Sequence, residues 1–215
     1  MREFDEAITF IKKALRRDNK NFYAHYRLGL CQIRNNMRDE GIKSLKTALK
    51  LSPNDLETQL KLAEVYLREE ATLKDAKDII KMVVRQNPNL CEGYIQLGRV
   101  YDKEGKHDDA LETFKKALQI STLDKNNKKA NLNAHFFTGC QYEQLKDPKQ
   151  SIFHFKQCLL FDQSHFGACI HLATQLANSG DFPKAEKYFR HCIKLNPTSV
   201  PAHFGLGKIL QHFEQ

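Results

Sequence analysis

The feature that most constrains this chain is a segment, residues 91–122, in which two amphipathic stretches flank a short turn. Its sequence is CEGYIQLGRVYDKEGKHDDALETFKKALQIST. Apolar residues recur at helical spacing on both sides of Glu104-Gly105-Lys106, which predicts an antiparallel helical hairpin. Gly98 and Ala110 are small where the two helices would approach closely. Each predicted helix keeps an apolar face that a neighbour must cover.

The same unit recurs along nearly the whole chain. Matching residue types return at the positions occupied here by Tyr94, Leu97, Gly98, Tyr101, Ala110, Phe114 and Ala117. With this pattern the chain resembles the tetratricopeptide family, whose repeat is a helix–turn–helix of about 34 residues. The resemblance implies an all-α fold in which helical hairpins stack into a right-handed superhelical solenoid.

The repeat positions divide the chain into five full hairpins with half a repeat at each end. We expect a half repeat over residues 1–21, full repeats over residues 22–55, 56–90, 91–131, 132–165 and 166–199, and a half repeat over residues 200–215. The half repeats leave apolar stripes without a partner helix. This favours a fragment of a longer repeat protein, or ends that are covered by further repeats or partner subunits.

Two segments depart from the regular repeat. The turn at Glu70–Thr72 carries one extra residue. An insertion over Ser121–Asn131, STLDKNNKKAN, delays the opening of the next repeat to Leu132. Because the inserted residues are polar and basic, they predict either a longer loop or an extension of a helix.

Composition excludes several classes of protein. Of the 215 residues 41% are hydrophobic and 28% are charged, without a long apolar run, so we expect no membrane span. The first residues resemble neither a signal peptide nor a transit peptide, which favours a cytoplasmic location and leaves the cilium and the nucleus open. The cysteines form no CxxC pair, which predicts structural free thiols in a reducing compartment: Cys31, Cys91, Cys140, Cys158, Cys169 and Cys192.

The sequence contains no recognisable catalytic motif. A glycine-rich phosphate loop, a GxSxG elbow and an HExxH pair are all missing. His25, His135 and His203 share one repeat position, which predicts packing or hydrogen-bonding roles rather than metal ligation. We therefore expect no enzyme active site, no cofactor and no metal site in this chain.

The family resemblance implies a partner-binding groove lined by the first helices of successive repeats. The fifth position of each repeat is apolar throughout, and the groove residues that we expect are Tyr26, Arg27, Leu30, Leu60, Lys61, Ile95, Arg99, Phe136, Phe137, Ile170, His171 and Phe204, with Cys140 and Glu143 beside them. Two interpretations of the apolar stripe stay open. It holds an extended or helical protein segment, or it packs against neighbouring helices.

The expected groove lacks the two best-understood ligand chemistries of the family. The lysine and asparagine clamp of chaperone-binding members is missing at the fifth and ninth positions. The repeated asparagines of the O-linked GlcNAc transferase superhelix are missing at the sixth. Basic residues flank the stripe in the first half of the chain, which would suit an acidic and apolar protein segment.

The resemblance implies a non-catalytic scaffold or adaptor in a multiprotein assembly, such as ciliary, axonemal or transport machinery. Two alternatives remain. The formal net charge of +8 at pH 7 could serve nucleic-acid binding, which the lack of aromatic–basic interleaving disfavours. The chain could also be the targeting or regulatory arm of an enzyme whose catalytic domain lies elsewhere.

Overall fold

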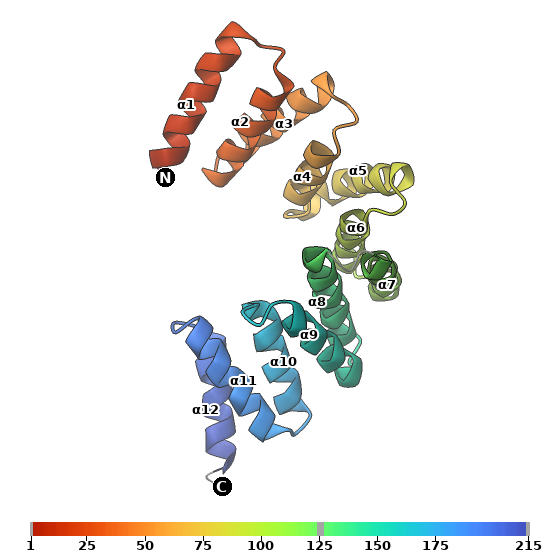
Figure 1. The fold of residues 1–215 in the computed structure, drawn as a ribbon, viewed down its shortest axis with the longest axis vertical. Coiled ribbons are helices and arrows are strands. Elements are labelled where there is room, and N and C mark those ends of the chain that lie inside the picture. The colour runs from red at the N-terminus through yellow and green to blue at the C-terminus, as the bar shows by residue number, and fades with distance from the viewer. Residues whose placement is uncertain (1, 124–126, 214–215) are drawn as a thin grey trace. The chain divides into compact units, whose positions relative to one another are not determined.

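The computed structural model describes residues 2–123 and 127–213, and these residues form helices joined by short turns (Figure 1). Residue 1, residues 124–126 within the predicted insertion and residues 214–215 lie outside the described residues. The helices are α1 Arg2–Arg17, α2 Phe22–Arg34, α3 Arg38–Leu51, α4 Leu56–Tyr66, α5 Leu73–Gln86, α6 Cys91–Lys103, α7 His107–Leu123, α8 Lys128–Gln144, α9 Pro148–Phe161, α10 Phe166–Asn178, α11 Phe182–Leu195 and α12 Val200–Phe213, with a 3₁₀ helix at Glu70–Thr72. The predicted all-α fold built from helical hairpins is confirmed.

The helices form two compact units, residues 1–88 and residues 89–215. Within each unit, every helix packs on the next one in sequence. We call α2, α4, α6, α8, α10 and α12 the first helices, and α1, α3, α5, α7, α9 and α11 the second helices. In the second unit, successive first helices also contact one another, α6 with α8, α8 with α10, and α10 with α12. One side of this unit is therefore built from first helices.

Local sequence explains where many helices begin. Asn21 and Asp55 stand before α2 and α4, and each side chain accepts a hydrogen bond from a backbone N–H of the first turn. Asp147 and Asp181 cap α9 and α11 in the same way. Such caps satisfy N–H groups that have no partner within the helix. These four helices therefore begin directly after a polar residue that precedes an apolar run.

The two departures from the regular repeat have different structures. Glu70–Thr72 forms a 3₁₀ turn before α5. Around the insertion, α7 continues to Leu123, and α8 begins at Lys128, four residues before Leu132. Asn127 caps α8 through a hydrogen bond from Ala130, and lysine and alanine residues that favour helix follow it. Of the two predicted outcomes, the described part of the insertion is helix extension.

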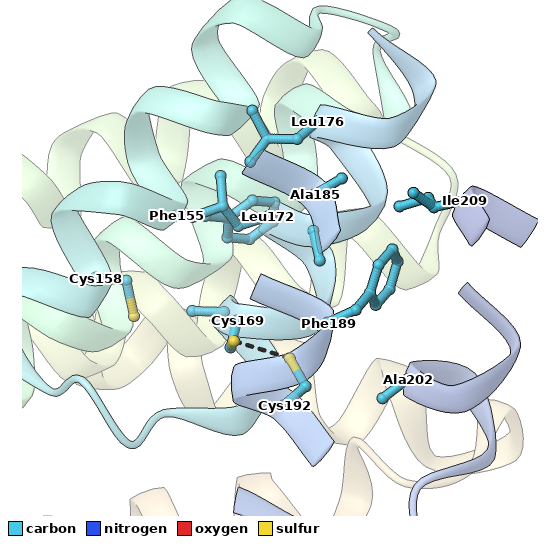
Figure 2. Close-up of a cluster of buried hydrophobic side chains, with 12 residues drawn as sticks. Phe155, Cys158, Cys169, Leu172, Leu176, Ala185, Phe189, Cys192, Ala202 and Ile209 are labelled. Atoms are coloured by element: carbon cyan, nitrogen blue, oxygen red, sulfur yellow. Dashed lines mark hydrogen bonds between the residues drawn. The ribbon is translucent and has the colours of Figure 1, made fainter. Parts of the chain in front are cut away.

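The core of the second unit is continuous from α9 to α12 (Figure 2). Phe155 and Leu172 are fully buried, and Phe189 is 3% exposed. Cys158 and Cys192 are fully buried, as predicted for structural thiols. The sulfur atoms of Cys169 and Cys192 lie 2.8 Å apart, and this contact and burial raise the pKa of Cys192. The Cys169 and Cys192 thiols pack as small apolar groups between α10 and α11.

Close approach within the hairpins depends on glycine in the first helix facing a bulky residue in the second. A Cβ atom on Gly98 would lie 2.5 Å from Cε1 of the buried Phe114. Gly139 faces Phe155 in the same way, because a Cβ atom on Gly139 would lie 2.9 Å from Cε1 of Phe155. Around Gly207 in α12, by contrast, no described atom lies within 4 Å of the corresponding position.

Gly98→Ala is expected to lower the free energy of unfolding by up to about 2 kcal/mol. Overpacking against a buried ring costs about 1–3 kcal/mol, which exceeds the gain of about 1 kcal/mol in helix propensity. The matched Gly207→Ala change has open space and should leave stability equal or higher. Urea unfolding followed by circular dichroism measures both. Equal effects at the two glycines would contradict the close-packing role of Gly98.

Candidate protein-interaction surface

In the first unit, Tyr26 joins α2 to α4. Its side chain is 3% exposed, and its hydroxyl donates a hydrogen bond of 2.5 Å to Glu57 Oε1 on α4. Burial, reinforced by the Glu57 carboxylate, raises the pKa of Tyr26 well above its usual value. At this position the apolar stripe therefore packs within the protein. Leu30 and Leu60 are half-buried and keep part of their surface open.

The neighbouring charged groups of the first unit remain accessible. Arg27 is exposed and donates to the hydroxyl of Tyr23, over whose ring its guanidinium lies at 4.8 Å. Lys61 Nζ donates to Glu64 Oε2 at 2.5 Å, and Arg68 lies 3.8 Å from the other carboxylate oxygen. Two basic groups, Lys61 and Arg68, therefore surround the Glu64 carboxylate, and Arg27 lies at Tyr23.

In the second unit, members of the predicted stripe differ widely in exposure. Ile95 is 1% exposed and packs in a core cluster with Ala117 and Ala134. Ile170 is half-buried, whereas Phe204 on α12 is 63% exposed with Lys208 Nζ 4.6 Å above its ring. The stripe therefore packs against neighbouring helices at Ile95 and leaves Phe204 exposed.

Two adjacent phenylalanines of α8 form the apolar centre of the first-helix side. Phe137 stacks on Phe114 at 5.7 Å, and the Arg99 guanidinium lies 5.4 Å from the Phe137 ring. Phe136 contacts the ring of His165 at 4.9 Å and packs against the core beneath α10. Both phenylalanines are half-buried, so each ring supports the core and still offers an edge to solvent.

A polar group lies beside these rings and joins α8 to α10. Glu143 accepts hydrogen bonds of 2.7 Å from His171 Nδ1 and of 2.7 Å from Gln175 Nε2. Burial would raise the pKa of Glu143, but His171 and Gln175 outweigh it and lower that pKa. Its carboxylate therefore stays ionised at neutral pH with 24% of the side chain exposed, and His171 is 39% exposed.

We call the surface formed by Arg99, Phe136, Phe137, Glu143 and His171 the aromatic–polar face. It combines apolar rings with one cation and one carboxylate, which suits non-covalent binding of a peptide-like ligand. Burial, with a smaller effect of Glu143, raises the pKa of the adjacent Cys140 thiol to about 12, so this thiol is not a nucleophile at neutral pH. No cluster of three or more potential metal ligands occurs among the described residues.

Sequence reasoning missed two residues that contact this surface, His165 and Gln175. Gln175 follows His171 by one helical turn, so the helical periodicity of α10 could have indicated it. His165 precedes α10, where its ring nitrogen caps Ala168 and its ring packs on Phe136. The second role depends on a different helix, and no local pattern in the sequence carries it.

The histidines at the shared repeat position form hydrogen bonds, as predicted. His25 Nε2 donates to the Asn19 carbonyl at 3.0 Å, and His203 Nε2 donates to the Pro197 carbonyl at 2.9 Å. His135 Nδ1 instead lies 3.0 Å from His154 Nδ1, so one ring donates and the other accepts. His25 and His203 each bond to the loop that precedes their own helix, and His135 joins α8 to α9.

Family models described as tetratricopeptide repeat match residues 91–122 and, in a second version, residues 22–55 and 166–199. Each matched segment is one of the helical hairpins described above. The chain contains tetratricopeptide repeats. The crystal structure of the APC/C hetero-tetramer Cut9–Hcn1 shares the fold, with a TM-score of 0.82 and 17% identity over 97% of this chain and 40% of that chain.

Two curated relatives are similar in sequence to this tetratricopeptide array. The human protein O-mannosyl-transferase TMTC3 is 26% identical over 78% of the chain and 18% of its own length. The peroxisomal targeting signal receptor of Candida albicans is 22% identical over 95% of the chain and 35% of its own length. The array thus spans about a fifth to a third of these relatives. Within the described residues, every helix is too short or too polar to cross a lipid bilayer.

Proposed function

We propose that this array is a non-catalytic scaffold or adaptor that binds a segment of another protein through its first helices. The observation that carries the proposal is the aromatic–polar face. There, the half-buried Phe136 and Phe137 lie between Arg99 and the Glu143–His171 pair. Interfaces typically combine an aromatic centre with polar groups at the rim, and this face has that composition.

The partner segment is an extended or helical stretch of protein that places apolar side chains on the two rings. A carboxylate of the partner near Arg99 and a hydrogen-bond donor near Glu143 would complete the contacts. The first unit offers a separate surface, where Arg27, Lys61 and Arg68 would suit acidic residues. A cytoplasmic location and membership of a larger assembly, including ciliary or transport machinery, belong to the same proposal.

The reported similarities differ in what they support. The name of the Candida albicans relative describes a receptor for a targeting signal, and that relative matches 95% of this chain. The likeness to Cut9–Hcn1 supports the fold alone, at 17% identity. A binding role therefore depends on the surface chemistry of this chain rather than on a single relative.

A second candidate function is the targeting or regulatory arm of an enzyme. The similarity to the O-mannosyl-transferase favours it, because this array covers only 18% of that protein. The two candidates differ in one measurable respect. Mannosyl transfer by the longest protein that the natural gene encodes would support the enzyme arm, and its absence in a protein that still binds its partner would support the adaptor.

The binding surface can be tested at Arg99 without disturbing the core. A photo-crosslinking amino acid at position 99 should form an adduct with one defined partner in cells, which mass spectrometry identifies. With that purified partner, Arg99→Glu should raise Kd about tenfold or more, or about 1.4 kcal/mol. Alanine at Phe136 or Phe137 is less informative, because both rings also pack against the core.

Lys116→Glu provides the matched control. Lys116 is exposed on the second helix α7, and its replacement changes the net charge by the same amount as Arg99→Glu. The control should leave Kd within about twofold of the wild-type value. If both variants weaken binding equally, the effect reflects overall charge, and the aromatic–polar face is not the binding site.

A further inference from the structure

A groove of about 820 Å³ lies between α9 and α11, two second helices of the second unit. The aromatic–polar face, by contrast, is built on the first helices, so the two surfaces use different side chains. The groove contains basic residues of both helices together with two leucines and a tyrosine. The proposed adaptor function does not use this groove.

One wall of the groove is a basic stripe on α11. Lys187, Arg190 and Lys194 recur at spacings of three and four residues, are all exposed, and therefore lie on one face of the helix. Lys156 adds a further ammonium group from α9. The stripe therefore concentrates positive charge along one face of α11.

Nearby carboxylates neutralise this charge only in part. Glu186 accepts a hydrogen bond of 2.8 Å from Arg190 Nε, and Asp181 accepts one of 2.6 Å from Lys184 Nζ. Within the described residues, no salt bridge reaches Lys156, Lys187 or Lys194. The ammonium groups of Lys187 and Lys194 are therefore available to an external anion, and Lys156 is attracted to Asp181 without forming a salt bridge.

The opposite wall and the floor add apolar surface. Leu160 on α9 is 76% exposed, and Leu159 and Tyr188 are half-buried within the groove. On the same stripe of α9, two turns before Leu160, Phe153 is 51% exposed. A large aliphatic side chain left this exposed between cations suits a ligand that brings both carboxylates and apolar groups.

We propose that this groove binds an acidic, leucine-containing segment of a partner protein. Carboxylates of the segment pair with the α11 stripe and Lys156, while its apolar side chains cover Leu160. A protein segment fits better than nucleic acid, because Leu160 would stay exposed beside a phosphate backbone, whereas apolar side chains of a protein segment cover it. The proposal is independent of the first-helix surface.

Fluorescence anisotropy with a labelled synthetic peptide of glutamate and leucine tests the groove. At physiological salt, the triple variant Lys187→Glu, Arg190→Glu, Lys194→Glu should raise Kd at least about tenfold, because it replaces three attractions by repulsions. The matched triple Lys12→Glu, Lys13→Glu, Arg16→Glu alters exposed residues of α1 by the same total charge and should change Kd by less than about threefold. Circular dichroism confirms that both variants are folded.

A second variant tests the apolar contribution and the class of ligand. Leu160→Ser should weaken the glutamate–leucine peptide about threefold or more and leave a glutamate–serine peptide unchanged. Equal losses for the two triple variants, or no binding of the peptide, would overturn the proposal. The proposal would also be overturned if a single-stranded oligonucleotide bound more tightly than the peptide and its Kd did not change in the Leu160→Ser variant. Arg99→Glu should not alter peptide binding here, which separates this site from the proposed adaptor face.

Discussion

Phe155→Ala is expected to lower the free energy of unfolding of the second unit by about 3–5 kcal/mol. The Phe155 ring is fully buried, fills the space that Gly139 leaves open, and stacks on His171 at 5.2 Å. Its removal leaves a cavity at the junction of α8, α9 and α10. Because helices in such an array depend on their neighbours, the cavity should affect stability well beyond α9.

Phe153→Ala is the matched control for this prediction. Phe153 lies on the same helix, two residues earlier, but is 51% exposed. Its loss should change stability by less than about 1 kcal/mol. Urea unfolding monitored by circular dichroism compares the two variants directly. A similar midpoint for both would show that Phe155 is not packed as described.

Acidification from pH 7 to pH 5 is expected to destabilise the second unit by about 2 kcal/mol through His154. Burial, then the positive charges of His135 and Lys115, lower the pKa of His154 from 6.5 to about 4. Burial also lowers the pKa of His135. The two imidazoles are 3.0 Å apart, and Tyr142 stacks on His154 at 5.5 Å, so a second proton is poorly accommodated.

The sign of this effect follows from proton uptake. The unfolded chain binds a proton at His154 below about pH 6.5, whereas the folded protein resists it until about pH 4. The stabilisation by neutral His154 is therefore complete above pH 6.5 and is lost as the pH falls from 6.5 toward 4. Measurement at pH 5 stays above the range in which most carboxylates titrate.

Substitution distinguishes His154 from other acid-sensitive groups. His154→Gln should lose most of the difference in urea midpoint between pH 7 and pH 5, even if the variant is less stable at both. His25→Gln, which changes a histidine bonded only to a loop carbonyl, should keep the wild-type difference. If His154→Gln retains that difference in full, another group is responsible.

Local pattern predicted the hairpins accurately because the information for them is local. The turn expected at Glu104-Gly105-Lys106 lies between the end of α6 at Lys103 and the start of α7 at His107. Gly98 is small because Phe114 occupies the space beside it, and both belong to one repeat. The insertion was less predictable, since loop and helix extension differ by little free energy in a polar segment.

Local sequence pattern could not predict which side chains of the expected groove are exposed. Tyr26 and Phe204 occupy the same repeat position, yet one is 3% exposed and the other 63%. The difference arises because Glu57 of the following first helix bonds to Tyr26. Burial depends on residues distant in sequence, and a repeat position does not specify them.

The sequence by itself determined the helical hairpins, their small-residue contacts and the buried thiols, because helical periodicity and residue size act within one repeat. Tertiary structure alone decided which of the expected groove residues are exposed, how Glu143 joins His171 and Gln175, and that basic residues of α11 share a groove with Leu160 of α9. Those features require side chains from different helices to meet in space, and packing sets their distances and their exposure.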